Sequence, residues 1–175
     1  MNKDLVRNLF HYNPESGELV WKKRTREMFK SDHSCASWNT RYAGKSVKTL
    51  DGKGYLCATV LGKRFSAHRL IWLYVNGKWP KIIDHVNGVK TDNRISNLRE
   101  VTVQENHLNM RKSSKNTSGV TGVYFNKSRS LWCAQMKFNG KTYHIGSSKD
   151  KSEAVKMRKD EEKRLGFSER HGESC

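Results

Sequence analysis

The apolar residues of the first part of the chain fall in short runs, which predict small helices and strands. Residues 3–10 carry Leu, Val and Phe at helical spacing and predict a short amphipathic helix. A turn over 12–17 then leads into a strand over 18–22. Residues 23–45 show no clear period, so no element is predicted there.

A hairpin and a second helix are predicted next. The Asp51-Gly52-Lys53-Gly54 sequence separates two apolar runs and predicts a β-hairpin that pairs 47–50 with 55–61. Apolar positions on one side of the following segment predict a helix over 67–74, for which Ser66 is a plausible N-cap.

The pattern then becomes polar. A short β-type run at 81–83 is followed by a loop rich in Asn and Asp. Thr102 and Glu105 have the spacing of a capping box, which signals the start of a helix. Asn106 therefore falls in the second turn of that helix.

The last part of the chain predicts a separate small module. Residues 122–126, 131–138 and 141–145 read as three short strands, and a capped helix follows over 151–165. The basic, polar stretch 111–118 has no apolar period and is predicted to be a linker that lies along a bound nucleic acid.

Composition and charge narrow the possible partners. The 175 residues include 35% hydrophobic and 29% charged ones, so the core is modest. A formal net charge of +17 favours a polyanionic partner, with nucleic acid as the first candidate. The longest apolar run, 70–75, is far shorter than a membrane span, and no signal-peptide pattern opens the chain.

The four cysteines are far apart and form no Cys-x-x-Cys pair. They are expected to be reduced thiols in a cytosol, without a structural zinc ion.

The polar loop and the helix after it contain the residue types that phosphodiester hydrolysis needs. An imidazole such as His85 can deprotonate water near neutral pH, because its ordinary pKa is about 6.5. A carboxylate and an amide, here Asp84 and Asn106, can hold a hard cation such as Mg²⁺ that neutralises phosphate charge. The competing interpretation is structural: most single histidines serve packing, and Asn-Gly and Asp-Asn steps are ordinary turn formers.

The joint spacing of these residues resembles a known family. Residues 83–102 read Ile-Asp-His-x-Asn-Gly-x-Lys-x-Asp-Asn-x-x-x-Asn-Leu-Arg-x-Val-Thr, which is similar to the HNH endonucleases with a ββα-metal fold, in particular small phage and intron-encoded homing nucleases. The resemblance implies that His85 is the general base, that Asn97 braces the loop and orients the imidazole, and that Asp84 and Asn106 bind Mg²⁺ or Mn²⁺. His107 is the less favoured alternative to Asn106, since only one of two neighbouring helical positions can face the metal.

Two expectations about geometry and organisation follow. In a regular strand Asp84 and His85 would face opposite sides, so the strand is expected to end or twist at Asp84. The fold is expected to be α+β, with N-terminal hairpins and a helix leading into a ββα core of about 66–110. The expected divisions are a nuclease domain, a linker, a terminal module and a tail, at 1–110, 111–118, 119–167 and 168–175.

Residues 119–165 resemble the DNA-binding domain of plant ethylene-response factors, the APETALA2 type. The shared landmarks are Gly122-Val123, Trp132 with Ala134, His144-Ile145-Gly146 and Glu153-Ala154. The resemblance implies that the outer face of the sheet enters the major groove of DNA, whereas Trp132 packs on the helix. The alternative is a generic module that only stabilises the chain.

Basic and aromatic residues mark further candidate DNA contacts. The segment 38–45, Trp-Asn-Thr-Arg-Tyr-Ala-Gly-Lys, is similar to segments of phage HNH proteins. Its aromatic residues suit a loop that follows DNA or one that is anchored to the core. The candidates are Arg24, Arg26, Lys30, Arg41, His68, Arg69, Arg111, Lys112, Lys115, Tyr124, Asn126, Arg129, Gln135, Lys137 and His144.

The sequence thus predicts a monomeric, metal-dependent endonuclease that nicks double-stranded DNA at a preferred sequence, in the cytosol of a host cell if a phage encodes it. The first alternative is a DNA-binding regulator that keeps the nuclease scaffold without catalysis. The second is a protein that binds or cleaves RNA.

Overall fold

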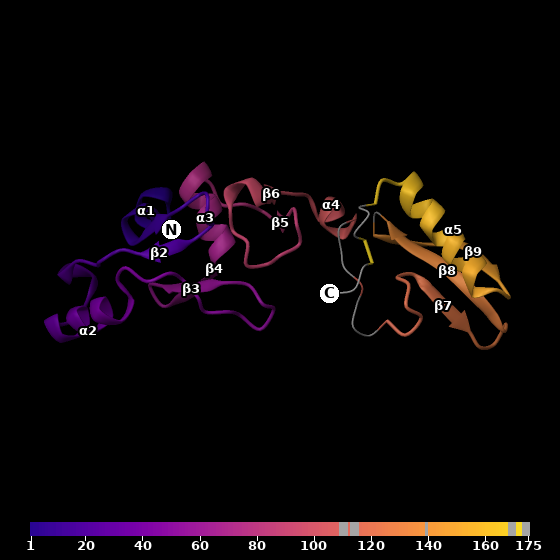
Figure 1. Ribbon diagram of the computed structural model, residues 1–175, viewed down its shortest axis with the longest axis horizontal. Helices are drawn as coiled ribbons and strands as arrows, with labels where there is room; N and C mark the ends of the chain where they lie inside the picture. The colour runs from indigo at the N-terminus through magenta and orange to yellow at the C-terminus, as the bar shows by residue number, and fades with distance from the viewer. Residues whose placement is uncertain (109–111, 113–115, 139, 168–170, 173–175) are drawn as a thin grey trace. The chain divides into compact units, whose positions relative to one another are not determined.

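The computed structural model forms two compact units, Met1–Val101 and Thr102–Cys175 (Figure 1). It describes residues 1–108, 112, 116–138, 140–167 and 171–172. Small antiparallel sheets and separate helices confirm the predicted α+β class. The boundary after Val101 differs from the expected domain end at 110, and it places the helix with Asn106 in the second unit.

The first unit is built around a helix pair and two small hairpins. Helix α1 (Lys3–Leu9) contacts α3 (Ala67–Asn76). Strand β1 (Phe10–Tyr12) pairs with β2 (Leu19–Trp21), and β3 (Cys57–Val60) pairs with β4 (Lys63–Ser66). Their apolar sides form one core, whose fully buried members include Val6, Leu9, Phe10, Val60, Leu70 and Ile71.

Helix α2 (Asp32–Tyr42) lies in the segment for which no element was predicted. It buries no residue completely, so it lacks the apolar stripe by which a helix is recognised in a sequence. It is stabilised at its start by a capping box between Ser31 and Ser34. Near its end the Trp38 ring packs edge to face on Trp21, with centroids 5.3 Å apart. A 3-10 turn, η1 (Arg26–Met28), precedes it.

The predicted hairpin is displaced along the chain. The Asp51–Gly54 turn forms and brings Leu50 and Leu56 together in an isolated bridge, but residues 47–50 do not form a strand. The regular hairpin is β3–β4, which turns at Leu61-Gly62. Ser66 does occupy the N-cap position of α3, although its side chain makes no capping hydrogen bond.

A third hairpin ends the first unit. Strand β5 (Ile83–His85) pairs with β6 (Leu98–Glu100), and a 3-10 turn, η2 (Ile95–Asn97), leads into β6. The register pairs Asp84 with Arg99 and His85 with Leu98. The strand therefore continues through His85. Of the two expected alternatives, that the strand ends or twists at Asp84, the first was wrong.

The second unit begins with α4 (Val103–Leu108) and continues into a three-stranded sheet and a helix. The sheet has the order β7 (Val123–Asn126), β8 (Leu131–Phe138), β9 (Lys141–Ser148), and α5 (Lys151–Arg164) covers one face (Figure 1). Ala134 and Ala154 are fully buried between sheet and helix. Gly146 permits this close contact, because an added Cβ would lie 2.6 Å from the Met157 sulfur.

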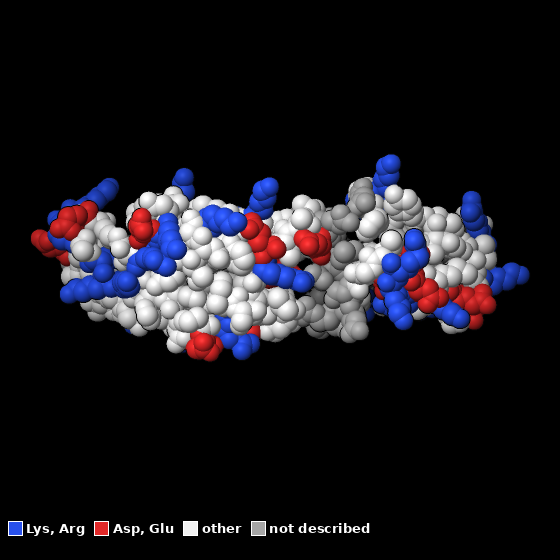
Figure 2. Space-filling model, turned by 90° about the horizontal axis from the view of Figure 1, so that it is seen from above, with Lys and Arg blue, Asp and Glu red and all other residues white. Residues whose placement is uncertain are grey.

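Within the described part of the chain, no helix has the length and apolar character needed to cross a membrane. Figure 2 shows one face of the molecule, on which Lys and Arg side chains are spread over both units with acidic side chains among them. The basic surplus on this face is therefore distributed and does not form a single strip.

Candidate active site

The His85 imidazole is buried at the end of β5 and held by a second buried polar side chain. His85 is 4% exposed and Asn93 is 1% exposed. The Nε2 atom of His85 lies 3.0 Å from Oδ1 of Asn93. An amide oxygen accepts a hydrogen bond, so this contact places the imidazole proton on Nε2 and leaves Nδ1 as the basic nitrogen.

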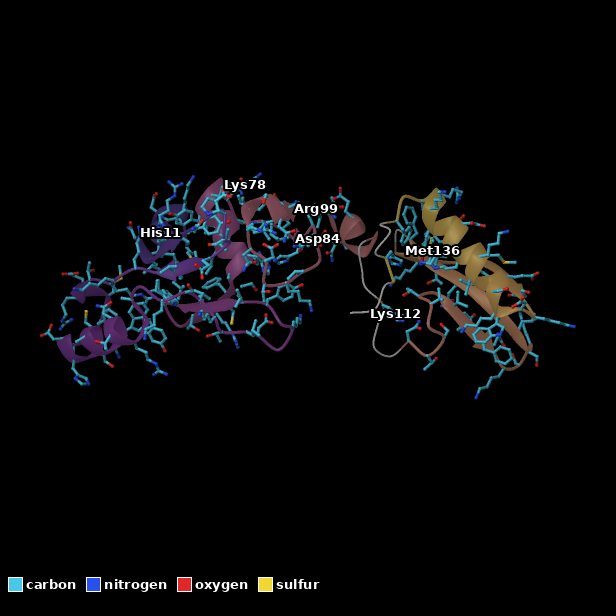
Figure 3. All side chains as sticks on the ribbon, viewed as in Figure 1. His11, Lys78, Asp84, Arg99, Lys112 and Met136 are labelled. Carbon is cyan, nitrogen blue, oxygen red and sulfur yellow. The ribbon has the colours of Figure 1, made fainter. Side chains whose placement is uncertain are left out.

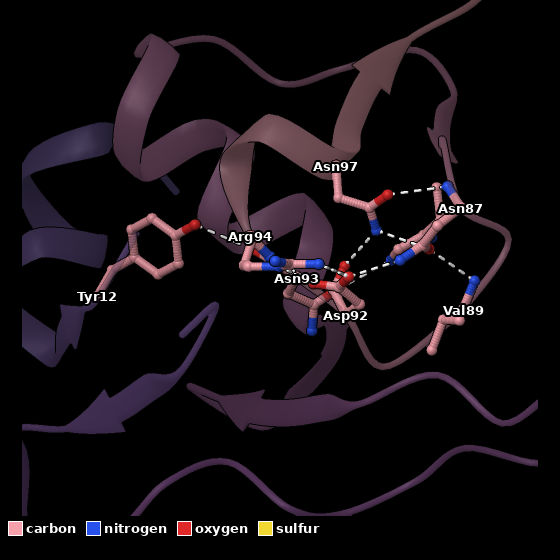
Figure 4. A network of polar contacts seen from close by, with 8 residues as sticks. Tyr12, Asn87, Val89, Asp92, Asn93, Arg94 and Asn97 are labelled. Atoms are coloured by element: carbon pink, nitrogen blue, oxygen red, sulfur yellow. Dashed lines mark hydrogen bonds and ion pairs between the residues drawn. The ribbon is translucent and has the colours of Figure 1, made fainter. Parts of the chain in front are cut away.

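The loop between β5 and β6 is fixed by its own side chains (Figure 4). Asn97 donates to the Asn87 side-chain oxygen at 2.9 Å and to the Asp92 carbonyl at 2.8 Å, while its oxygen accepts from the Asn87 backbone N–H at 2.9 Å. Asp92 accepts two hydrogen bonds from Arg94, which lower the Asp92 pKa to about 2. Asn97 therefore sits where it can brace the loop, as the sequence suggested.

The loop is also tied to the N-terminal hairpin. The Tyr12 hydroxyl donates to the Asn93 carbonyl at 2.9 Å (Figure 4). Gly17 has a φ of +75°, and a Cβ at this position would lie 2.5 Å from the backbone nitrogen of Arg94. The backbone of 93–94 thus packs directly against Gly17, which fixes the position of Asn93 and, through its hydrogen bond, of the His85 imidazole.

Asp84 lies on the side of the β5–β6 ribbon where its cross-strand neighbour Arg99 lies (Figure 3). The Arg99 Nε and Nη2 atoms donate to one carboxylate oxygen of Asp84 at 3.0 and 2.7 Å. The Asp84 side chain is 15% exposed. This pairing holds the carboxylate at a fixed position at the surface of the hairpin, next to the buried imidazole in the chain.

Two aromatic side chains from other elements surround the imidazole. The Tyr55 ring lies 5.9 Å from that of His85, and the His68 ring packs edge to face on His85 at 5.2 Å. Burial raises the pKa of Tyr55, and the charges of Asp51 and Asp84 raise it further. Tyr55 therefore interacts electrostatically with the Asp84 carboxylate and packs against the His85 ring.

His68 is 8% exposed, and burial together with the neighbouring His85 lowers its pKa to about 4. Its neutral ring packs between Tyr55 and His85, with the Tyr55 centroid at 5.0 Å. The predicted contact of His68 with a phosphate is at odds with this burial, because the ring is a wall of the imidazole site. Arg69 is directed to the Pro80 carbonyl at 2.9 Å.

Asn106 lies on α4, half-buried, and the capping box predicted for this helix is confirmed. Thr102 Oγ1 accepts from the Glu105 N–H at 3.2 Å, and Glu105 accepts from the Thr102 N–H at 2.7 Å. The side chain of His107 lies outside the described residues. Helix α4 with Asn106 belongs to the second unit, whereas Asp84, His85 and Asn97 belong to the first.

Each unit contributes one motif residue with the oxygen donors that a hard divalent cation prefers. Asp84 and Asn106 offer oxygen donors, which Mg²⁺ and Mn²⁺ prefer. The described residues contain no cluster of three or more His, Cys, Asp or Glu side chains that could enclose a metal. A cation at Asp84 would therefore rely on water and phosphate oxygens for most of its ligands.

The remaining N-terminal candidates are distributed over the segment before α3. Arg24 is half-buried against Trp21 and Trp38, and exposed Arg26 pairs with Asp32. Lys30 and Arg41 are exposed, and the Arg41 guanidinium lies over the Tyr42 ring at 5.4 Å. The aromatic residues of this segment thus do pack against the core, whereas Arg26, Lys30 and Arg41 stay at the surface.

The C-terminal candidates divide into two groups. Gln135 faces His144 across β8 and β9, and Lys137 lies two residues further on the same side, whereas buried Met136 faces α5. Tyr124 and Arg129 are exposed, but the Asn126 oxygen accepts from Ser128 and Arg129 and so stabilises a turn. Lys112 donates to the Gly119 carbonyl; Arg111 and Lys115 lie outside the described residues.

Sequence reasoning missed Asn93 and Tyr55. Asn93 belongs to an Asp-Asn step that reads as an ordinary turn, and nothing in its spacing indicates that it is buried beneath the imidazole. Tyr55 comes from the distant 51–55 turn, which only the folded chain brings to His85. The Tyr55 ring also receives Lys90, whose Nζ lies 5.3 Å from the ring centre.

A two-stranded ribbon with a buried, oriented histidine, a braced Asn-rich loop and a following helix defines an HNH-type nuclease domain. The family model for HNH endonucleases matches residues 65–108, which span this arrangement. The chain therefore carries an HNH endonuclease domain.

Two curated relatives are viral. Protein 3.8 of Escherichia phage T7 is 34% identical over 82 residues, which cover 46% of this chain and 68% of that protein. The "Uncharacterized HNH endonuclease L560" of Acanthamoeba polyphaga mimivirus is 33% identical over 119 residues, or 66% of this chain and 57% of that protein. The chain therefore belongs to one family with Protein 3.8 and carries an HNH endonuclease domain at residues 65–108, and no solved structure matches it significantly.

Proposed function

We propose that this protein is a divalent-metal-dependent endonuclease that hydrolyses phosphodiester bonds in double-stranded DNA. The observation that carries the proposal is the buried His85 imidazole, oriented by Asn93 inside an HNH endonuclease domain. A net charge of +17 supports a polyanionic substrate.

His85 is proposed to act as the general base. With its proton on Nε2 and shared with Asn93, the ring presents Nδ1 to a water molecule and takes the proton as water attacks the phosphorus. The surrounding His68 and Tyr55 rings limit the rotation of the imidazole. Asn97 keeps the loop in the shape that holds Asn93 in place.

Asp84 and Asn106 would hold the cation, with Arg99 fixing the Asp84 carboxylate. When bound, Mg²⁺ or Mn²⁺ supplies positive charge that stabilises the phosphate and the departing 3′-oxygen. One such site per chain would cut one DNA strand, so a monomer would nick the duplex.

The second unit is proposed to supply sequence preference. Gln135, Lys137 and His144 share the sheet face opposite α5, where alternate side chains can reach a DNA groove. The role is proposed to be of the homing type, in the cytosol of an infected host; both relatives named above are viral proteins.

Replacement of the general base tests the proposal. His85→Ala should bind duplex DNA with near-native affinity but cleave it about 10²- to 10⁴-fold more slowly in Mg²⁺. His11→Ala is the matched control, because His11 is an exposed histidine of the same unit, and it should cleave normally.

The outcomes separate the alternatives. Cleavage by His85→Ala at the native rate would overturn the assignment of the base. Salt-sensitive binding that ignores Mg²⁺ and yields no product, even from the native protein, would indicate a non-catalytic regulator. Preferential cutting of structured RNA in competition with duplex DNA would move the substrate to RNA.

A further inference from the structure

The first unit contains a pocket that the proposed nuclease chemistry does not use. It has a volume of about 980 Å³ and lies between α2, the segment 45–49 and the β3–β4 hairpin. Its lining shares no residue with Asp84, His85 or the loop that carries Asn93. Within this unit, α2 lies toward one end and β5 and β6 lie toward the other (Figure 1).

The lining of this pocket is cationic. Arg24, Arg41, Lys45, Lys48 and Arg64 contribute to it, and no carboxylate does. Arg64 is held in place by the Leu50 carbonyl, which accepts from its Nη2 at 3.0 Å. Such a concentration of positive charge in a lining without carboxylates favours an anionic ligand.

Arg24 is the most constrained of these cations. Its guanidinium carbon lies 3.9 Å from the Trp38 ring centre and 4.8 Å from that of Trp21. Asn39 fixes its backbone by accepting from the Arg24 N–H at 2.9 Å and donating to its carbonyl at 3.0 Å. The side chain is thus held on two indoles at the pocket wall.

Within the part of the chain that the structure describes, no carboxylate pairs with the Arg24 guanidinium. Its Nε and Nη2 atoms are buried without a hydrogen-bond partner among the described residues, which include all of the first unit. Burial lowers the pKa of this guanidinium, which shows that the charged form is desolvated. A desolvated arginine without a carboxylate is stabilised when a phosphate binds beside it, because a guanidinium pairs well with phosphate oxygens.

The apolar part of the lining distinguishes between forms of nucleic acid. Trp21, Trp38, Tyr42, Val47 and Ala58 contribute rings and aliphatic groups next to the cations. In a duplex the faces of the bases are covered by stacking, and only the base edges in the grooves and the phosphates are accessible. An unpaired nucleotide can place its base against apolar walls while its phosphate meets the cations, as in single-strand binding sites.

We propose that this pocket binds an unpaired nucleotide of a DNA strand, with Arg24 and the rim cations on the phosphate and the aromatic wall on the base. The proposal rests on the proposed action on DNA and adds a preference for substrates that have a single-stranded segment beside the duplex. The volume is large enough for a nucleotide, since small-molecule sites are of similar size.

The test compares two DNA probes with the full-length chain in EDTA, so that cleavage plays no part. One probe is a blunt duplex, and the other is the same duplex with a short single-stranded tail. The native protein should bind the tailed probe about tenfold more tightly, the value of roughly one stacked base. Arg24→Gln should remove this preference.

Two further variants protect the test against a folding defect. Arg41→Gln with Lys48→Gln alters only exposed rim cations and should also remove the preference. Lys22→Gln with Lys23→Gln removes two exposed charges outside the pocket, and it should weaken both probes equally while the preference stays.

Three results would overturn the proposal. These are the absence of a tail preference in the native protein, its persistence in both pocket variants, and its equal loss in the Lys22 and Lys23 control. A ribonucleotide tail that binds more than about tenfold tighter than the DNA tail would reassign the pocket to RNA.

Cleavage of the blunt duplex by the native protein in Mg²⁺ is measured in parallel. If cleavage occurs without a tail preference, only the pocket proposal fails. If the preference is present without cleavage, only the proposed nuclease function fails.

Discussion

The loop between β5 and β6 and the outer face of the C-terminal sheet use polar residues in opposite ways. In the loop, Asn93 and Asn97 are buried; Asn93 is hydrogen-bonded to His85 and Tyr12, and Asn97 is hydrogen-bonded to other residues of the loop. On the sheet, Lys137 and His144 are exposed on the side away from α5. The first arrangement fixes one imidazole, whereas the second leaves side chains available to a partner.

This difference predicts how each region responds to substitution. A buried amide acts through the group that it positions, so its loss should reduce the cleavage rate far more than DNA affinity. An exposed cation acts alone through the phosphate that it contacts, so its loss should reduce affinity slightly and leave the rate at saturating DNA unchanged.

The largest effect is expected from Asn93→Ala. Without the Oδ1 acceptor, the His85 ring loses the contact that fixes its tautomer and orientation, and cleavage should slow about 100-fold at saturating DNA. Asn39→Ala is the control, because it also removes a hydrogen-bonded side-chain amide, in this case one on α2 that bonds the Arg24 backbone. If both variants lose activity in proportion to their unfolding free energy, Asn93 has only a structural role.

The next effect concerns the support beneath the loop. Gly17→Ala should destabilise the first unit by about 2 kcal/mol and slow cleavage, because the new Cβ must push the 93–94 backbone aside. Gly44→Ala imposes a similar positive φ, with nothing within 4 Å of the new Cβ, so it should cost only about 1 kcal/mol and retain the cleavage rate. Urea unfolding followed by tryptophan fluorescence, with cleavage rates, compares them; equal rates would show that Asn93 does not rest on this glycine.

The sequence predicted elements best where their signals are local. Strand β8 and helix α5 follow from alternation, an Asn-Gly turn and a capping Asp150, which needs no distant contact. Helix α2 was missed because its stability comes from Trp38 packing on Trp21, a contact between separate segments.

The same distinction applies to the candidate site. The spacing of Asp84, His85 and Asn97 is a local signal, and the β-type run predicted at 81–83 overlaps β5, whereas β6 was not predicted. The contacts of His85 with Asn93, Tyr55 and His68 depend on the fold of 51–93, so no spacing rule revealed them. The catalytic and metal-binding roles themselves remain predictions.

The free energy of unfolding of the first unit should depend on pH through His68. The His68 pKa falls from 6.5 when unfolded to about 4 when folded, so the unfolded chain binds the extra proton between these values. Stability is therefore complete above pH 6.5 and decreases as the pH falls toward 4, by about 1.5 kcal/mol after relaxation of the site. Urea unfolding of the first unit at pH 7 and 4.5 measures it, and His68→Gln should reduce the difference; an unchanged difference would assign the effect to other groups.

The smallest effect is expected on the exposed sheet. Lys137→Gln should weaken duplex binding about two- to threefold and reduce the slope of log affinity against log salt by about one, because one phosphate contact is lost. Lys156→Gln removes the same charge from the exposed side of α5, on the other face of the module, and should leave affinity and slope nearly unchanged. Equal losses from the two lysines would mean that the sheet face contributes only to the overall charge, and the contrast with the buried loop would then lie in burial alone, without a dedicated DNA-binding face.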